Sequence, residues 1–480
     1  MKVIILSFLS LTLGYNSLSQ NNSKSIDALK NETATTIQSG YDAYKKIALS
    51  IWDYAELGYK ENKSSALLQN TLKENGFSVD AGVAGMPTAF VATYGSGSPV
   101  IGILAEYDAL PGISQDISPL KTPIANKTNG HACGHHLFGT GSVAAGIAIK
   151  KLLETGKLKG TIKIFGSPAE EGGSGKVYLV REGLFKNVDV VMHWHADEHN
   201  AVMYTSALAN KSAKFRFYGI SSHASVSPEK GRSALDAVEA MNNMVNMMRE
   251  HIPQETRIHY VITNGGKAPN VVPEFAEVYY YVRHPEKTLA VSIFDRITKA
   301  AEGAALGTET KMDYEIIGGT HDLLINKTLA INMQNNLEKV GGVKYTEEEK
   351  IFSKKIQESF MGKYESIDSA AIVKALYIEK NQGSTDVGDV SYAVPTVGVE
   401  AATWVPGTSS HSWQAVACGG TDIGMKGMMV ASKTLAFTAI DLFTTPALIK
   451  KAKEEFVQTK GDYKYKALLG DRKPALNYRD

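Results

Sequence analysis

The order of the expected strands and helices constrains the fold of this chain more than any other feature of its sequence. Short β-branched and apolar runs in the first half read as strands. These runs are Ala89–Tyr94, Val100–Ala105, Thr161–Phe165 and Val188–His193. A small-residue, apolar helix is expected at Leu137–Leu153, and helical spacing of apolar residues marks 26–75. Strands that alternate with helices predict an α/β fold with a mixed, largely parallel sheet flanked by helices.

A different order of elements follows Leu208 and predicts an inserted α+β domain. The expected order is β-α-β-β-α-β, the split βαβ arrangement. Its elements are the strands Ser212–Tyr218, Arg257–Thr263, Glu277–Arg283 and Thr310–Ile317 and the helices Ser233–His251 and Leu289–Ala305. We therefore expect an α/β domain in two parts, 24–208 and 323–480, that is interrupted by an inserted domain at 209–322.

The N-terminal segment has the character of a secretory signal. Lys2 is followed by the apolar run Val3–Leu13 and then by small and polar residues up to Gln20. The run is too short to span a bilayer comfortably, although a buried N-terminal helix is an alternative. We expect residues 1–19 to be a signal peptide and the protein to be secreted or periplasmic. No later apolar stretch predicts a membrane span, and the net charge of +1 gives no footprint for nucleic acid.

Histidines gather around one cysteine in the first half of the chain. Six of the twelve histidines lie between residues 131 and 199, and the densest motif is His131-Ala-Cys133-Gly-His135-His136. It directly precedes the apolar helix, whose N-terminus favours a thiolate, and thiolate and imidazole are ligands for zinc-like metals. The alternative is a free, buried cysteine among loop histidines.

Further candidate ligands follow expected strands or lie in a late loop. Glu170 and Glu171 come after the strand Thr161–Phe165, at the sheet edge where α/β proteins bind ligands. One carboxylate can bind a metal while its neighbour acts as a general base. His193 and His195 share one face of a strand, and His411 stands alone in a loop. Each of these has a structural alternative, such as a solvated charge pair or a hydrogen-bonded histidine.

The joint occurrence of these groups favours a two-metal hydrolase site. Successive sheet edges can bring a Cys/His pair, an acidic pair and a strand histidine together. No Gly-x-Ser-x-Gly serine motif is present. Cys133 as a nucleophile, with His135 or His195 as its base, is the alternative, but it leaves the paired glutamates unexplained.

Together these motifs resemble the M20 metallopeptidase family and its amidohydrolase branch. The segments that carry the resemblance are Glu106-Tyr-Asp108-Ala-Leu-Pro111, His131–His135, Pro168–Gly172, His195 and His411. Within the branch, the chain most resembles the group formed by the B-type subunits of p-aminobenzoyl-glutamate hydrolase. That likeness rests on Ala105–Gln115, Leu137–Ala145, Ser384–Ser391 and His411–Gln414.

The resemblance implies a role for each matching residue. Two divalent metal ions, zinc or manganese, would be held by Cys133, His135, Glu171, His195 and His411. Glu170 would be the general base. Asp108 would orient a metal-ligating side chain without binding the metal itself. In the inserted domain, which resembles a dimerisation domain, His223 would reach the active site of the partner subunit. Asn270 and Arg283 would hold the substrate.

The function implied is metal-dependent hydrolysis of the amide bond in an N-acyl or N-aroyl amino acid, such as p-aminobenzoyl-glutamate. The alternatives are a dipeptidase of the same family, a Cys-dependent amidase and a non-catalytic secreted protein that binds amino-acid conjugates. A homodimer is expected, and a second, non-identical subunit is a further possibility. A disulfide between Cys133 and Cys418 would contradict the metal site.

Overall fold

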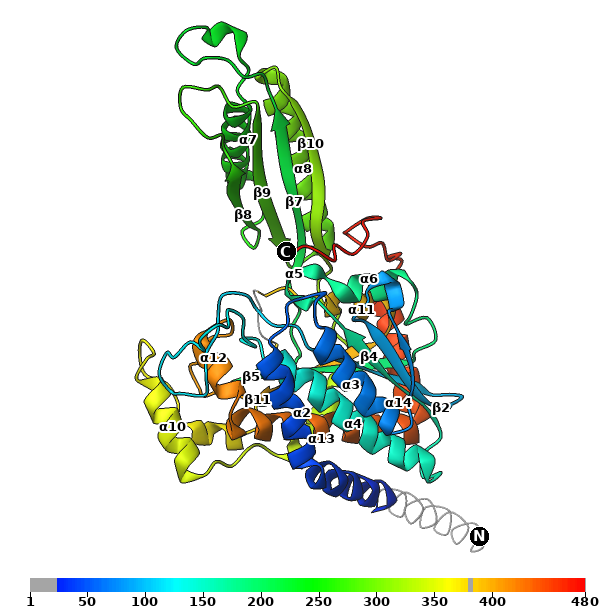
Figure 1. Ribbon diagram of the computed structural model, residues 1–480. Coiled ribbons are helices and arrows are strands. Elements are labelled where there is room, and N and C mark those ends of the chain that lie inside the picture. The colour runs from blue at the N-terminus through cyan, green and yellow to red at the C-terminus, as the bar shows by residue number, and fades with distance from the viewer. Residues whose placement is uncertain (1–23, 379–382, 480) are drawn as a thin grey trace, which may run out of the picture.

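A computed structural model describes residues 24–378 and 383–479. The expected signal peptide, 1–19, lies outside the described residues. Two parts are visible: a layered α/β body and a domain that projects from it (Figure 1). Within the described ranges, no helix has the length and apolar character needed to cross a membrane.

The body is built on a seven-stranded sheet. The strand order is β1-β2-β4-β3-β5-β11-β6. The strands are β1 Ser78–Ala81, β2 Phe90–Ser96, β3 Val100–Glu106, β4 Gly160–Ser167, β5 Val190–Asp197, β6 Ala201–Val202 and β11 Thr396–Ala402. The central strands β4, β3, β5 and β11 are parallel, whereas β1, β2 and β6 pair antiparallel at the edges. The predicted mixed, largely parallel sheet is confirmed.

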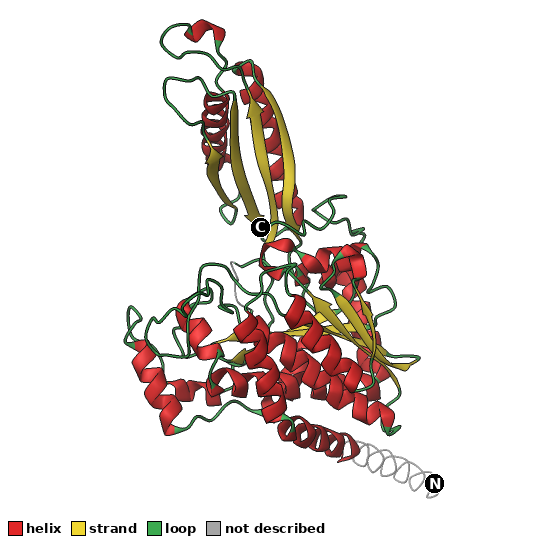
Figure 2. Cartoon of the chain, viewed as in Figure 1, coloured by secondary structure: helices red, strands yellow, loops and turns green. Residues whose placement is uncertain are grey.

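Helices cover this sheet (Figure 2). Residues 24–39 are also helical. The longer helices are α2 Tyr41–Tyr54, α3 Asn62–Glu74, α4 His135–Glu154, α9 Lys327–Val340, α10 Glu347–Gln357, α13 Asp422–Thr444 and α14 Pro446–Lys460. The short ones are α5 Glu170–Gly173, α6 Gly175–Arg181, α11 Val387–Ala393 and α12 Trp413–Gly419. Most of α4 is buried, since small residues let it lie against β3. A Cβ atom on Gly139 would come within 2.5 Å of the Glu106 backbone oxygen.

The projecting domain contains a four-stranded antiparallel sheet of order β10-β7-β9-β8. Its elements are β7 Ala209–Tyr218, α7 Ala234–Met248, β8 Arg257–Asn264, β9 Phe275–His284, α8 Lys287–Gly307 and β10 Lys311–Thr320. This succession confirms the predicted split βαβ arrangement. The domain has a hydrophobic core of its own, in which Phe215, Phe217 and Phe294 are buried. β8 is an edge strand, and most of its residues are exposed.

Candidate metal centre

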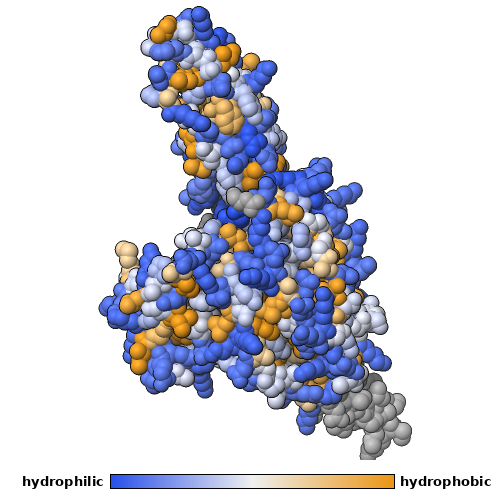
Figure 3. All heavy atoms as spheres, viewed as in Figure 1, coloured by the Kyte–Doolittle hydropathy of each residue, from blue (hydrophilic) through white to orange (hydrophobic). Residues whose placement is uncertain are grey.

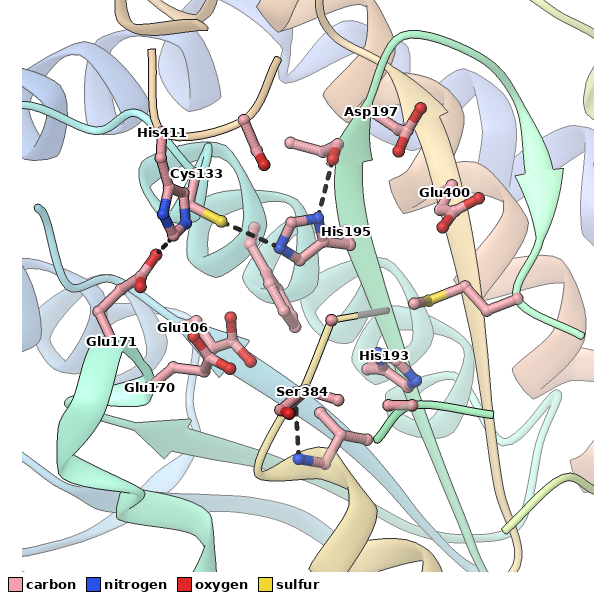
Figure 4. Close-up of a pocket in the computed structure, with 18 of the residues that line it drawn as sticks. Glu106, Cys133, Glu170, Glu171, His193, His195, Asp197, Ser384, Glu400 and His411 are labelled. Atoms are coloured by element: carbon pink, nitrogen blue, oxygen red, sulfur yellow. Dashed lines mark hydrogen bonds and ion pairs between the residues drawn. The ribbon is translucent and has the colours of Figure 1, made fainter. Parts of the chain in front are cut away.

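The predicted ligands converge where the parallel strands end. Asp108 follows β3, Glu170 and Glu171 follow β4, and His195 lies near the end of β5. Cys133 precedes α4, which packs against β3, β4 and β5. Cys133, Glu170, Glu171, His195 and His411, which precedes α12, line one cavity (Figure 4). Asp108 and His135, at the start of α4, are buried behind this lining.

Cys133 is shared by two sets of possible metal ligands. The first set is Cys133, His135 and His195, and the second is Cys133, Glu171 and His411. Within each set, the ligand atoms lie within 4.8 Å of one another. The Cys133 Sγ atom is 3.4 Å from Nε2 of His195, and Nε2 of His411 is 3.1 Å from Oε1 of Glu171. This arrangement suits two ions that share a thiolate.

Asp108 fixes members of both sets from behind. Its Oδ1 atom is 2.9 Å from Nδ1 of His135, and its Oδ2 atom accepts a hydrogen bond from the Glu171 amide at 2.9 Å. The other ring nitrogen of His135 is thereby directed toward the site, where Oε2 of Glu106 lies 3.1 Å away. A carboxylate behind a histidine is the usual support of a metal-ligating imidazole.

The donor atoms fit a divalent cation. In the part of the chain that is described, His135 Nε2, Glu106 Oε2 and Glu171 Oε1 are buried without a hydrogen-bond partner. The first two lie 3.1 Å from each other, and Glu171 Oε1 lies 3.1 Å from Nε2 of His411, in ion-pair contacts. Burying such polar atoms unpaired is costly, and a cation would satisfy them. Thiolate, imidazole and carboxylate are the ligands that zinc accepts.

The two adjacent glutamates have opposite electrostatic surroundings. Burial and the nearby carboxylates of Glu106 and Glu171 raise the pKa of Glu170 well above its usual range. Burial also opposes ionisation of Glu171, but its ion pair with His411 and the charge of His135 outweigh burial and lower the pKa of Glu171. When the pKa values of two carboxyl groups are shifted in opposite directions, one group can act as a proton acceptor and the other as an anionic ligand.

The helix N-terminus was expected to favour a thiolate at Cys133, but the protein surroundings alone favour the protonated thiol. Burial, together with the negative charge of Glu171, raises the pKa of the Cys133 thiol. These effects outweigh the helix dipole, so a bound cation is what would deprotonate this sulfur. Cys133 and Cys418 are both free, which excludes the disulfide that would have contradicted the site.

Three nearby histidines take no part in these two ligand sets. Nε2 of His131 lies 3.0 Å from the Ile51 carbonyl oxygen, and Nε2 of His136 lies 2.9 Å from that of Gly419. Burial lowers the pKa of His193 to about 3, so its ring is neutral. These residues support the walls of the site.

The predicted substrate-binding residues are not all brought to the cavity. Arg283, on β9, lines this space of about 1000 Å³. His223 and Asn270 do not line it, and both are exposed in loops of the inserted domain. They lie beside each other there, since the Ala224 amide donates to the Asn270 carbonyl oxygen at 3.0 Å.

A buried ion cluster beside the site was not predicted. Lys176 Nζ lies 2.6 Å from Oε1 of Glu106 and 2.7 Å from Oδ1 of Asp386, and all three side chains are buried. Lys176 ends the Gly-Ser-Gly-Lys stretch after the acidic pair, which only partly resembles a phosphate loop. Its partner Asp386 is 210 residues away, and no local pattern signals that contact.

Comparison with known proteins agrees with this geometry. A model of the peptidase family M20/M25/M40 matches residues 102–414. The B-type subunit of p-aminobenzoyl-glutamate hydrolase from Escherichia coli (strain K12) is 40% identical over 449 residues, which cover 88% of this chain and 93% of the relative. The Xaa-Arg dipeptidase of Mus musculus is 30% identical over 453 residues, covering 90% of this chain and 93% of the relative.

Solved structures share the fold. The aminobenzoyl-glutamate utilization protein from Klebsiella pneumoniae superposes with a TM-score of 0.60 at 17% identity, covering 84% of this chain and 97% of that chain. A dinuclear metal-binding M20 peptidase from Bacillus subtilis gives a TM-score of 0.59 at 16% identity, covering 85% and 99%. The chain therefore belongs to the peptidase family M20/M25/M40 and is a metal-dependent hydrolase of amide bonds.

Proposed function

We propose that the chain cleaves the amide bond of N-aroyl or N-acyl amino acids, with p-aminobenzoyl-glutamate as a substrate. The observation that carries this proposal is the convergence of Glu170 with two ligand sets that share Cys133. The substrate follows from the E. coli relative, which spans nearly the whole chain and is named for this reaction.

In this proposal two divalent cations, zinc or manganese, are held on either side of the Cys133 sulfur. His135 and His195 complete one ligand set, and Glu171 and His411 complete the other. Sulfur and nitrogen ligands favour zinc, while the carboxylate also suits manganese. When bound, such cations lower the pKa of a water molecule and polarise the scissile carbonyl group.

Glu170 acts as the general base and then as the general acid. It is not needed for either set that contains Cys133, and its raised pKa favours the acceptance of a proton. Its carboxylate takes the proton of the attacking water. The carboxylic acid then delivers that proton to the nitrogen of the departing amine, so that the carboxylate is restored.

Arg283 binds the carboxylate of the amino acid and so orients the amide bond. His223 and Asn270 act in the cavity of a partner copy, since they lie outside the cavity of their own chain. In this proposal the two copies pair through the edge strand β8. Tyr260, Val261 and Ile262 are exposed there. On the face of the projecting domain that Figure 3 shows, apolar residues lie among hydrophilic ones.

Two further elements of the proposal concern partners and location. A second, non-identical subunit is consistent with the E. coli hydrolase, whose A-type and B-type subunits are both similar to this chain. Export to the periplasm or the exterior rests on Lys2 and the apolar run Val3–Leu13.

The proposal is tested by measuring p-aminobenzoate release from p-aminobenzoyl-glutamate with wild type and Glu170→Gln. The variant should lose about 10²–10⁴-fold in kcat while keeping its metal content, because a proton acceptor is lost but both ligand sets that contain Cys133 stay complete. Glu182→Gln makes the same change at an exposed position and should match wild type. A fully active Glu170→Gln enzyme would overturn the assignment of the base.

A further inference from the structure

The segment that follows α14 crosses the junction between the body and the inserted domain. Figure 1 shows this segment in red between the two parts. Arg472 donates to the Ile317 carbonyl oxygen on β10 at 2.8 Å, and Arg181 on α6 donates to the carbonyl oxygens of Gly470 and Arg472 at 3.2 and 2.7 Å. The segment is therefore fixed to both parts of the molecule.

Beyond these anchors the segment reaches the acidic turn of the metal centre. Tyr478 packs edge-on against Tyr59, and its hydroxyl group donates to the Glu171 carbonyl oxygen at 3.0 Å. Nη2 of Arg479 donates to the same oxygen at 2.5 Å. A side chain about 300 residues away in sequence thus lies directly beside the Glu170–Glu171 turn, and it lines the catalytic cavity.

Arg479 has unused binding capacity. Its Nε atom is buried without a hydrogen-bond partner. In the described ranges, no carboxylate forms an ion pair with it within 4.0 Å, although carboxylates line much of the cavity. The same is true of Arg283, whose Nε atom is also buried and unpartnered. Two guanidinium groups, held by different parts of the fold, thus each present a buried Nε atom without a partner among the described residues that line one cavity.

The other charged groups of the cavity restrict where an anion can bind. Asp197, Glu198 and Glu400 line a different stretch of the wall, and His199 is paired with Asp197 and Glu400 at 2.9 and 3.2 Å. A carboxylate is repelled from that wall and attracted to an unpaired guanidinium group, which can bind it bidentately.

We propose that Arg479 binds the side-chain carboxylate of an acidic amino acid in the substrate, while Arg283 binds its α-carboxylate. This inference rests on the proposed function and narrows it to conjugates of dicarboxylic amino acids. Arg479 would be a specificity-determining residue, and the segment around Arg472 and Tyr478 would position it.

The test compares p-aminobenzoyl-glutamate with p-aminobenzoyl-glutamine, which lacks only the side-chain charge. In the metal-loaded enzyme, Arg479→Ala should lower the ratio of kcat/KM for glutamate over glutamine about tenfold or more, mainly through KM. Arg479→Lys should restore part of the ratio, because it keeps the charge but loses the bidentate geometry. Lys473→Ala removes one exposed cation from the same segment and should leave the ratio unchanged.

An unchanged ratio in Arg479→Ala would overturn the inference, whether both activities are retained or both fall equally; an equal fall would indicate a purely structural role. Calorimetric binding of L-glutamate and L-glutamine to the same proteins separates this outcome from failure of the proposed function. Wild type should prefer glutamate, and Arg479→Ala should lose that preference, even if no p-aminobenzoate is released. If the preference for glutamate is absent in wild type or persists in Arg479→Ala, Arg479 does not recognise the side-chain carboxylate.

Discussion

The Oδ1 atom of Asp108 lies 2.9 Å from Nδ1 of His135, and both side chains are buried. The same carboxylate accepts the backbone amide of Glu171, so one residue fixes a member of each ligand set. The charge of His135 and these hydrogen bonds lower the pKa of Asp108 despite its burial, and it therefore stays ionised. Asp108 thus links the first helix of the site to the acidic turn after β4.

Asp108→Asn should weaken both contacts without touching a proposed ligand. An amide has only one oxygen acceptor, so the contact to His135 Nδ1 or that to the Glu171 amide is lost. We expect metal affinity, measured by competition with a chromogenic chelator, or activity to fall about 10–100-fold. The exposed variant Asp80→Asn should behave as wild type. Unchanged affinity and activity would show that Asp108 does not orient the ligands.

Lys176→Met should destabilise the fold strongly. Lys176 is fully buried between Glu106 and Asp386, and its removal leaves two buried carboxylates without their cation. We expect a loss of about 3–5 kcal/mol in the free energy of unfolding, measured by urea titration. Lys159→Met, at an exposed site, should cost less than about 0.5 kcal/mol. An equally small effect for both variants would contradict a structural role for the cluster.

His199 should make stability depend on pH on the alkaline side. Burial opposes its charge, but the bonds to Asp197 and Glu400 outweigh burial and raise the pKa of His199 to about 10. A raised folded-state pKa gives stability that is complete below the unfolded value, about 6.5, and is lost as the pH rises through about 10. The stability difference between wild type and His199→Asn should therefore shrink between pH 6.5 and 10. A difference that stays constant over this window would show that His199 is uncharged.

The edge strand β8 should carry the dimer contact. Val261 is 56% exposed there, and a charge at this position would oppose burial against a second copy. Val261→Asp should shift the protein to the monomer in light scattering and reduce activity, because His223 would no longer reach a partner cavity. Val457→Asp makes the same change on α14, where the side chain is 66% exposed, and should leave the dimer intact. A dimer that survives Val261→Asp would place the interface elsewhere.

Much of the fold was predictable because local patterns agree with the tertiary structure. The alternation of strands and helices predicts the largely parallel sheet, and the split βαβ order predicts the four strands of the second sheet. The ends of the strands differ from the expected ends by a few residues. For example, β5 continues past His193 to Asp197. Strand ends depend on pairing with β11, which is remote in sequence and has no local signal.

The site was predictable where its residues form short motifs. Cys133, His135, Glu170 and Glu171 stand in compact patterns, whereas His411 could be selected only through the family resemblance. Lys176 with Asp386, and Arg479 with the Glu171 backbone, are contacts between distant segments. Such contacts are produced by folding, so spacing along the chain does not reveal them.

The most direct test of this account is p-aminobenzoate release from p-aminobenzoyl-glutamate by purified protein before chelation, after chelation and after addition of Mn²⁺ or Zn²⁺. We predict release that is lost on chelation and regained with one of the two metals, because Cys133, His135, Glu171, His195 and His411 act only through bound cations. Release that persists at full rate after complete metal removal would contradict the account and favour a cysteine-dependent amidase.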